Sequence, residues 1–139
     1  MVQFAFIIPS TSNKRDDWKS AEDSYLWSIL CSSLEKYTPD IGNRRIKLFI
    51  GFDEDDRIYS IEEERLKFSA VFMNFDIEWF PQSVCLKGKL STIWNNLGKE
   101  ALDQGYDYIK LMGDDIRIPS DTGWLGLFAN KLKKNNNIG

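Results

Sequence analysis

Four short apolar runs, each ending in a polar loop, constrain the fold of this chain more than any other feature of its sequence. They occupy residues 3–8, 46–53, 76–81 and 106–112. The first has the continuous apolar character that is typical of a strand buried on both faces, and the second repeats this pattern as a β-rich apolar run that stops at an acidic cluster. We therefore expect four strands in a sheet that is covered on both sides.

The segments between and after these runs have the spacing of amphipathic helices. They predict helices over residues 18–37, 60–72, 90–104 and 123–134. Alternation of strand and helix requires a parallel sheet with right-handed crossovers. The expected fold class is α/β and Rossmann-like, a mainly parallel sheet flanked by helices, in a single domain over residues 1–139.

Composition excludes several classes of function. The chain has 18 basic and 21 acidic residues, a formal net charge of -3 and no histidine. Without a basic surplus there is no general attraction for phosphate backbones, so we expect no nucleic-acid partner. Without histidine, the Ser/His/Asp and Cys/His nucleophile arrangements and the commonest zinc sites are excluded. Any bound metal is therefore expected to have oxygen ligands.

Cysteine content and hydropathy bear on the compartment. The two cysteines, Cys31 and Cys85, do not indicate a disulfide framework. No apolar run approaches the roughly 20 residues of a membrane span, and the N-terminal run lacks the basic flank of a secretory signal. We expect a cytoplasmic protein with no membrane span.

Ligands of parallel sheets gather at the carboxyl ends of the strands. The loops expected there are residues 9–15, 53–57, 81–89 and 113–115. Hard divalent cations prefer carboxylate and phosphate oxygens, so the acidic pair that follows the fourth strand suits a metal site. The alternative interpretation is a solvated acidic turn.

The segment "YDYIKLMGDD", residues 106–115, resembles the strand and metal loop of the GT-A type glycosyltransferases, whose motif is Asp-x-Asp. On that pattern Gly113 occupies the first acidic position, Asp114 the variable one and Asp115 the last. The resemblance implies that Asp115 is a ligand of Mn²⁺ or Mg²⁺. It implies that Asp114 contacts the ribose or the other ligands of the metal.

The segment "IIPSTSNKR" resembles the loop of that family that meets the base and the ribose. The resemblance implies nucleotide contacts from Pro9, Ser10 and Thr11, and a more distant one from Arg15. Capping of the strand end is the alternative explanation for the two hydroxyl side chains.

Two further blocks extend the resemblance. Asp53 in "FIGFDEDD" matches an acidic position beneath the uracil, and "KGKLSTIWNNLGKEAL" resembles the segment after the third strand, which implies that Lys89 and Asn95 reach the nucleotide. A solvated turn and a solvated lysine are the alternatives for Asp53 and Lys89. Trp94 is open between core packing and stacking on a base or sugar.

The resemblance implies a metal-dependent glycosyltransferase, or its donor-binding portion, that uses a nucleotide-diphosphate sugar. A UDP-sugar is favoured by family frequency, and the acceptor is open between a glycan and a protein. Members continue well beyond the metal motif, whereas about two dozen residues follow Asp115. We therefore expect a GT-A fold truncated after the motif, and no catalytic base is assigned.

Two other classes of function are open. The short length favours a non-catalytic nucleotide-sugar-binding module. Acidic strand ends would also suit a Mg-dependent phosphoryl-transfer domain, although the sequence contains neither a Gly-x-x-x-x-Gly-Lys-Ser/Thr loop nor a Gly-x-Gly-x-x-Gly fingerprint.

Overall fold

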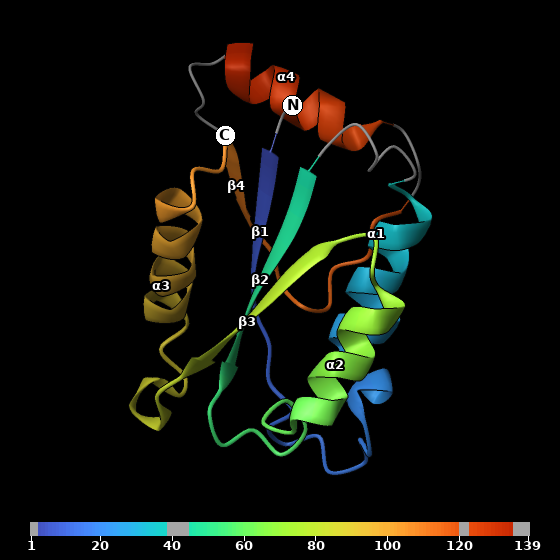
Figure 1. Cartoon of the computed structure of the whole chain (residues 1–139), viewed down its shortest axis with the longest axis vertical. Coiled ribbons are helices and arrows are strands. Elements are labelled where there is room, and N and C mark those ends of the chain that lie inside the picture. The colour runs from blue at the N-terminus through green and yellow to red at the C-terminus, as the bar shows by residue number, and fades with distance from the viewer. Residues whose placement is uncertain (1–2, 39–44, 120–122, 135–139) are drawn as a thin grey trace.

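A parallel sheet of four strands organises the molecule (Figure 1). The computed structural model describes residues 3–38, 45–119 and 123–134. All neighbouring strands pair in parallel, in the order β3-β2-β1-β4. The strands are β1 (Gln3–Pro9), β2 (Arg45–Asp53), β3 (Asp76–Gln82) and β4 (Tyr108–Leu111). The predicted α/β class and parallel sheet are confirmed, and the topology is consistent with a Rossmann-like fold.

Three of the four predicted helices form close to their expected bounds. They are α2 (Glu62–Val71), α3 (Leu90–Asp103) and α4 (Trp124–Lys134). α3 stops where the sequence predicts it, because Gly105 adopts a left-handed conformation with φ +80° just beyond its last turn.

The predicted continuous helix over residues 18–37 is wrong. The segment contains a 3₁₀ turn (Ala21–Asp23), a π-helix (Leu26–Cys31) and a short α-helix, α1 (Ser32–Lys36). Serine hydroxyls explain the departure, because they compete for backbone carbonyls. The Ser32 hydroxyl donates to the Trp27 carbonyl over 2.6 Å, and the backbone N–H of Ser32 bonds to the same carbonyl, five residues back. In an α-helix that N–H would bond to the carbonyl four residues back.

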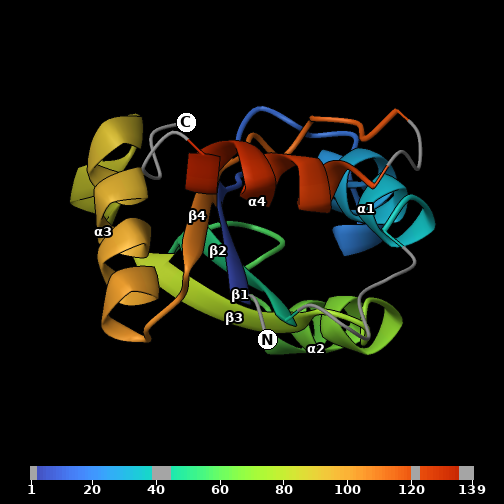
Figure 2. The ribbon, with the colours of Figure 1, turned by 90° about the horizontal axis from the view of Figure 1, so that it is seen from above.

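The sheet separates two hydrophobic cores. Side chains alternate along β1: Phe4, Phe6 and Ile8 enter the larger core with α1, α2 and α4, whereas Ala5 and Ile7 enter a smaller core with α3. Figure 2 shows α3 alone on one side of the sheet, with α1 and α2 on the other. Both faces of the sheet are covered, which explains why the central strands β1 and β2 are mainly apolar.

The strand order reverses direction between β1 and β4. The chain steps outward from β1 to β2 and β3, and then returns to the other side of β1. The loops that follow β1 and β4 therefore leave a crevice between them at the carboxyl end of the sheet, the lower end in Figure 1.

Cys31 is buried and Cys85 is exposed, and both are free thiols. Among the described residues, no helix combines the length and the apolar character required to cross a bilayer.

Candidate functional site

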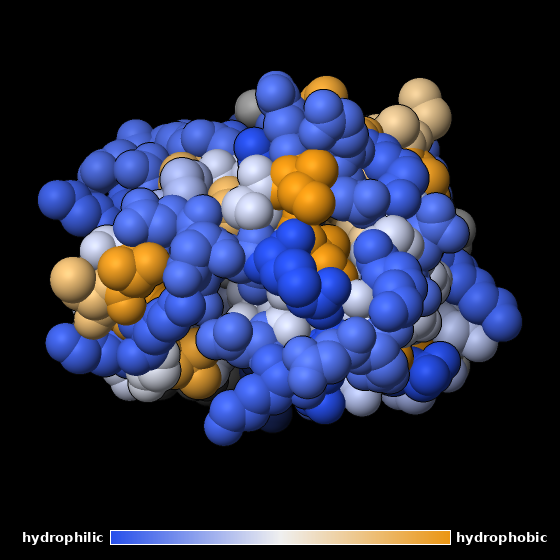
Figure 3. Space-filling model, turned by 90° about the horizontal axis from the view of Figure 1, so that it is seen from below, coloured by the Kyte–Doolittle hydropathy of each residue, from blue (hydrophilic) through white to orange (hydrophobic). Residues whose placement is uncertain are grey.

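A cavity of about 570 Å³ opens at the carboxyl end of the sheet. Figure 3 views this end from below and shows apolar surface in the middle of a mainly hydrophilic face. The cavity is built from the loops after β1, β2 and β4 and from the start of α3. Its lining consists of Pro9, Ser10, Thr11, Asn13, Gly51, Phe52, Asp53, Gly88, Leu90, Ile93, Trp94, Gly113, Asp114 and Asp115.

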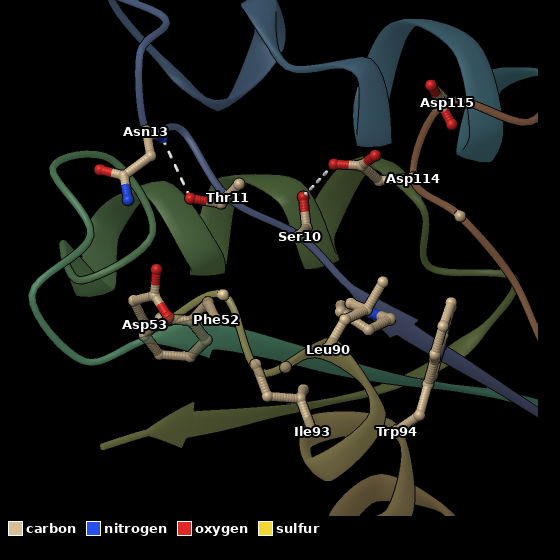
Figure 4. A pocket seen from close by; sticks show the side chains of 14 residues that line it. Ser10, Thr11, Asn13, Phe52, Asp53, Leu90, Ile93, Trp94, Asp114 and Asp115 are labelled. Atoms are coloured by element: carbon tan, nitrogen blue, oxygen red, sulfur yellow. Dashed lines mark hydrogen bonds between the residues drawn. The ribbon is translucent and has the colours of Figure 1, made fainter. Parts of the chain in front are cut away.

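Ser10 and Asp114 join the two strands that flank the crevice. Ser10 follows β1 and Asp114 follows β4, and the Ser10 hydroxyl donates to Asp114 Oδ2 over 2.8 Å (Figure 4). Ser10 is buried and Asp114 is half-buried. The site therefore coincides with the point at which open α/β sheets bind their ligands.

Asp114 and Asp115 have different surroundings although they are adjacent. Burial raises the pKa of Asp114; the hydrogen bond from Ser10 opposes this, and the charge of Asp115 adds to it. Asp115 is exposed. The chain turns at these two residues, so both carboxylates line the cavity even though they point in different directions in Figure 4. Asp115 is the carboxylate that is freer to bind a cation.

Asp53 is a buried carboxylate without a hydrogen-bond partner among the described residues. It ends β2, lines the cavity and is 9% exposed. Burial raises the pKa of Asp53, and the nearby charge of Lys87 opposes that rise. The carboxylate oxygens are acceptors that receive no donor among the described residues, so the position of Asp53 at the cavity suits a ligand that offers an N–H or O–H group.

An apolar wall lies opposite the polar loop after β1. In Figure 4, Leu90, Ile93 and Trp94 of α3 lie across the cavity from Ser10 and Thr11. Trp94 packs against the smaller core and also lines the cavity, so the two interpretations of this residue are compatible. Its indole nitrogen is buried and has no hydrogen-bond partner in the part of the chain that the structure describes.

α3 can pack close to β2, and so reach the cavity, because residue 51 of β2 is a glycine. A Cβ atom at Gly51 would lie 3.2 Å from side-chain carbons of both Ile93 and Leu97, which is closer than ordinary packing. Gly51 itself lines the cavity. The glycine thus allows the close approach of helix to strand that places the apolar wall.

Asp56 holds the loop after β1 in place, a role that we did not predict from the sequence. Its two carboxylate oxygens accept from the backbone N–H and the hydroxyl of Ser12, each over 2.7 Å. They also accept from the backbone N–H groups of Ile58 and Tyr59. An aspartate that receives N–H donors two and three residues later is a local turn pattern, which could have indicated a structural aspartate.

Six of the nine residues expected at the site line the cavity: Pro9, Ser10, Thr11, Asp53, Asp114 and Asp115. Arg15, Lys89 and Asn95 do not. The guanidinium of Arg15 lies over the rings of Tyr25 and Trp18, 4.8 and 5.5 Å from their centroids. Lys89 and Asn95 are exposed at the start and on the surface of α3.

The apolar residues of the lining and Asn13 were not predicted from the sequence. Phe52, Leu90 and Ile93 carry no chemical motif, since apolar residues at strand ends and helix starts are usually part of a core. Asn13 lies in the loop after β1, where its backbone N–H donates to the Thr11 hydroxyl over 3.0 Å. The fold brings both kinds of residue to the cavity.

The donor set suits a cation that is shared with a ligand. Among the described residues, no three histidine, cysteine or acidic side chains are grouped as they would be in a site that binds metal by itself. Mg²⁺ sites in nucleotide enzymes commonly use one or two carboxylates together with substrate phosphates and water. Asp114 and Asp115 can supply the one or two carboxylates that such a shared site needs.

No family model, no curated protein and no solved structure matches this chain.

Proposed function

We propose that this protein is a metal-dependent glycosyltransferase, or the donor-binding portion of one, that takes a nucleotide-diphosphate sugar. One observation carries the proposal. The acidic pair after β4, the loop after β1 and Asp53 after β2 line a single cavity at the point where the strand order reverses. They belong to three of the four segments in which the sequence resembles the donor site of the GT-A enzymes; in the fourth, residues 87–102, the predicted contacts Lys89 and Asn95 do not line the cavity.

The charge of the cavity supports a cation-dependent ligand. Three carboxylates line it, and none of its described lining residues is a lysine or an arginine. A bare diphosphate would be repelled by such a site, because like charges at short range disfavour each other. Bound Mn²⁺ or Mg²⁺ would neutralise the diphosphate as the leaving group departs.

The remaining lining suits a nucleoside. Asp53 can accept from an N–H group of a base, and uracil offers one at N3. The apolar wall of Leu90, Ile93 and Trp94, together with Phe52, supplies the surface on which a base or sugar can pack. From the opposite loop, the Thr11 hydroxyl can donate to the ribose, and the Ser10 oxygen keeps a second lone pair that can accept from it. UDP-sugars are therefore the favoured donors.

A non-catalytic nucleotide-sugar-binding module is the second possibility. The only titratable side chains that line the described cavity are Asp53, Asp114 and Asp115, and each already has a binding role in the proposal. None is assigned as a base for an acceptor hydroxyl, which transfer usually requires within about 3 Å.

Calorimetric titration of a nucleotide panel with and without Mn²⁺ tests the proposal. UDP and UDP-sugars should bind more tightly with the metal, and more tightly than GDP, ADP or ATP. Asp115→Ala should remove most of the enhancement by Mn²⁺, whereas Asp114→Ala should remove less. Asp103→Ala, an exposed acidic residue at the end of α3, serves as the control and should behave as wild type.

Equal enhancement by Mn²⁺ in the wild type and in Asp115→Ala would contradict the assignment of the metal ligand. Preference for ATP would favour phosphoryl transfer instead. Assays of nucleotide release and of glycosylated product then separate an enzyme from a binding module. We expect donor binding to exceed transfer, and slow hydrolysis of the donor to exceed transfer to an added acceptor.

A further inference from the structure

The structure assigns a positioning role to Tyr59, a residue outside the lining of the cavity. We propose that the Tyr59 hydroxyl directs the Ser10 hydroxyl toward Asp114 and so holds the Asp114 carboxylate in the orientation seen at the cavity. The assignment stands on hydrogen-bond geometry. Its consequence for ligand affinity rests on the proposed function.

A continuous line of hydrogen bonds runs from the larger core to the cavity. Tyr59 is 1% exposed, and its hydroxyl oxygen lies 2.8 Å from Ser10 Oγ. Ser10 is 6% exposed, and its hydroxyl donates to Asp114 Oδ2 over a further 2.8 Å. Of these three side chains, only Asp114 brings a carboxylate to the cavity.

The direction of the protons follows from the chemistry of the three groups. Serine has one hydroxyl proton, and Ser10 gives it to Asp114. The Ser10 oxygen is therefore the acceptor for Tyr59. Burial raises the pKa of Tyr59 above its ordinary value, so the phenol keeps its proton and remains a donor at neutral pH. Without that donor, Ser10 would lose the contact that restricts the rotation of its hydroxyl.

Tyr59 is itself held in place by the segment between β2 and α2. Its backbone N–H donates to Asp56 Oδ1 over 2.8 Å, and its carbonyl accepts from Arg65 over 2.6 Å. Its ring packs against Trp79 at 5.9 Å between centroids. The phenol therefore acts as a fixed donor, which is what a positioning residue requires.

The arrangement joins three loops that are distant in the sequence. Tyr59 lies 49 residues from Ser10, and Ser10 lies 104 residues from Asp114. The loop between β2 and α2 thus sets the orientation of a carboxylate that follows β4, although the two segments share no strand pairing.

A crystal structure of ligand-free Tyr59→Phe tests the geometry directly. We expect the hydrogen bond between Ser10 and Asp114 to be lost, or Ser10 to adopt more than one rotamer, while the backbone of β1 is unchanged. Tyr37→Phe is the matched control, because the described residues give its hydroxyl no partner, and it should leave the bond in place. An unchanged bond in Tyr59→Phe would overturn the proposal.

Ser10→Ala provides a second variant if Tyr59→Phe does not fold. Removal of the Ser10 hydroxyl should release the Asp114 carboxylate from its present rotamer. An Asp114 side chain that keeps the same orientation in Ser10→Ala would also overturn the assignment.

A double-mutant cycle on the binding of UDP with Mn²⁺ then tests the functional consequence. Tyr59→Phe and Ser10→Ala should each weaken binding by about three- to tenfold. The double variant should bind no more weakly than Ser10→Ala alone, because Tyr59 acts through Ser10. Multiplicative losses would contradict the functional consequence. If the wild type binds no UDP, the proposed function fails, whereas the crystal structures still decide the role of Tyr59.

Discussion

Two cavity carboxylates, Asp53 and Asp114, are held where their ionised forms are disfavoured. Burial raises the pKa of both. Asp114 receives a compensating hydrogen bond from Ser10, whereas Asp53 receives none among the described residues. Buried groups of this kind are common at functional sites, where stability is lost in exchange for readiness to bind.

Asp53→Asn should make the ligand-free protein more stable at pH 7. The pKa of Asp53 is raised above 3.8 in the folded state, so the folded protein holds this proton more tightly than the unfolded chain. The cost of burying the ionised group is absent below about pH 3.8 and is complete above the raised pKa. Thermal unfolding of both proteins from pH 3 to pH 7 should show a difference that grows with pH to about 1–3 °C.

The same substitution should weaken UDP binding, because the amide cannot replace the carboxylate as an acceptor of equal strength. Asp103→Asn, at an exposed position, should change stability by less than about 0.5 kcal/mol across the pH range. A variant that is less stable than the wild type at pH 7 would show that the Asp53 charge has a structural partner.

At the scale of elements, the loops after β1 and β2 are fastened to each other. Asp56 accepts four hydrogen bonds, two from Ser12 and one each from Ile58 and Tyr59. These bonds set the position of the loop that carries Ser10 and Thr11, and so one wall of the cavity depends on a residue in the other loop.

Asp56→Asn should lower the free energy of unfolding by about 2–4 kcal/mol. One oxygen is replaced by an amide group, which cannot accept from the N–H and O–H donors that surround it. Urea denaturation measures the loss. Asp55→Asn is the matched control, since Asp55 is exposed and its one ion pair among the described residues is with Lys87, and it should cost about 1 kcal/mol or less. Equal losses in the two variants would contradict the fastening role of Asp56.

At the scale of the whole molecule, we predict that the protein folds without a bound metal. Two apolar cores cover the two faces of the sheet, and the described residues offer no cluster able to hold a metal by itself. In the proposed function the cation would be shared between the carboxylates and the diphosphate, so we expect it to bind only together with the nucleotide.

A chelator should therefore leave the melting temperature of the ligand-free protein unchanged within about 1 °C. Mn²⁺ with UDP should raise stability by about 2.7 kcal/mol when free UDP is 100 times its Kd. Differential scanning fluorimetry with each component omitted in turn measures both effects. A chelator-induced loss of stability without nucleotide would reveal a structural metal instead.

The sequence by itself determined the architecture, because period and apolar content are local properties. Continuous apolar runs fixed the strands, and Gly105 fixed the end of α3. It also placed Ser10, Asp53 and Asp114 at strand ends, and parallel topology alone brings such ends to one edge. Local reasoning failed over residues 18–37, where serine hydroxyls bond to carbonyls and divide the expected helix.

Only the tertiary structure decided which of these residues share a cavity and what holds them there. Lys89 and Asn95 are close in sequence to the cavity residue Trp94, yet they face solvent, because the direction of a side chain on α3 depends on how the helix packs over Gly51. The contact between Tyr59 and Ser10 and the contact between Asp56 and Ser12 span 49 and 44 residues. Such hydrogen bonds leave no local pattern that joins their two partners, since they form only when separate loops meet at one edge of the sheet.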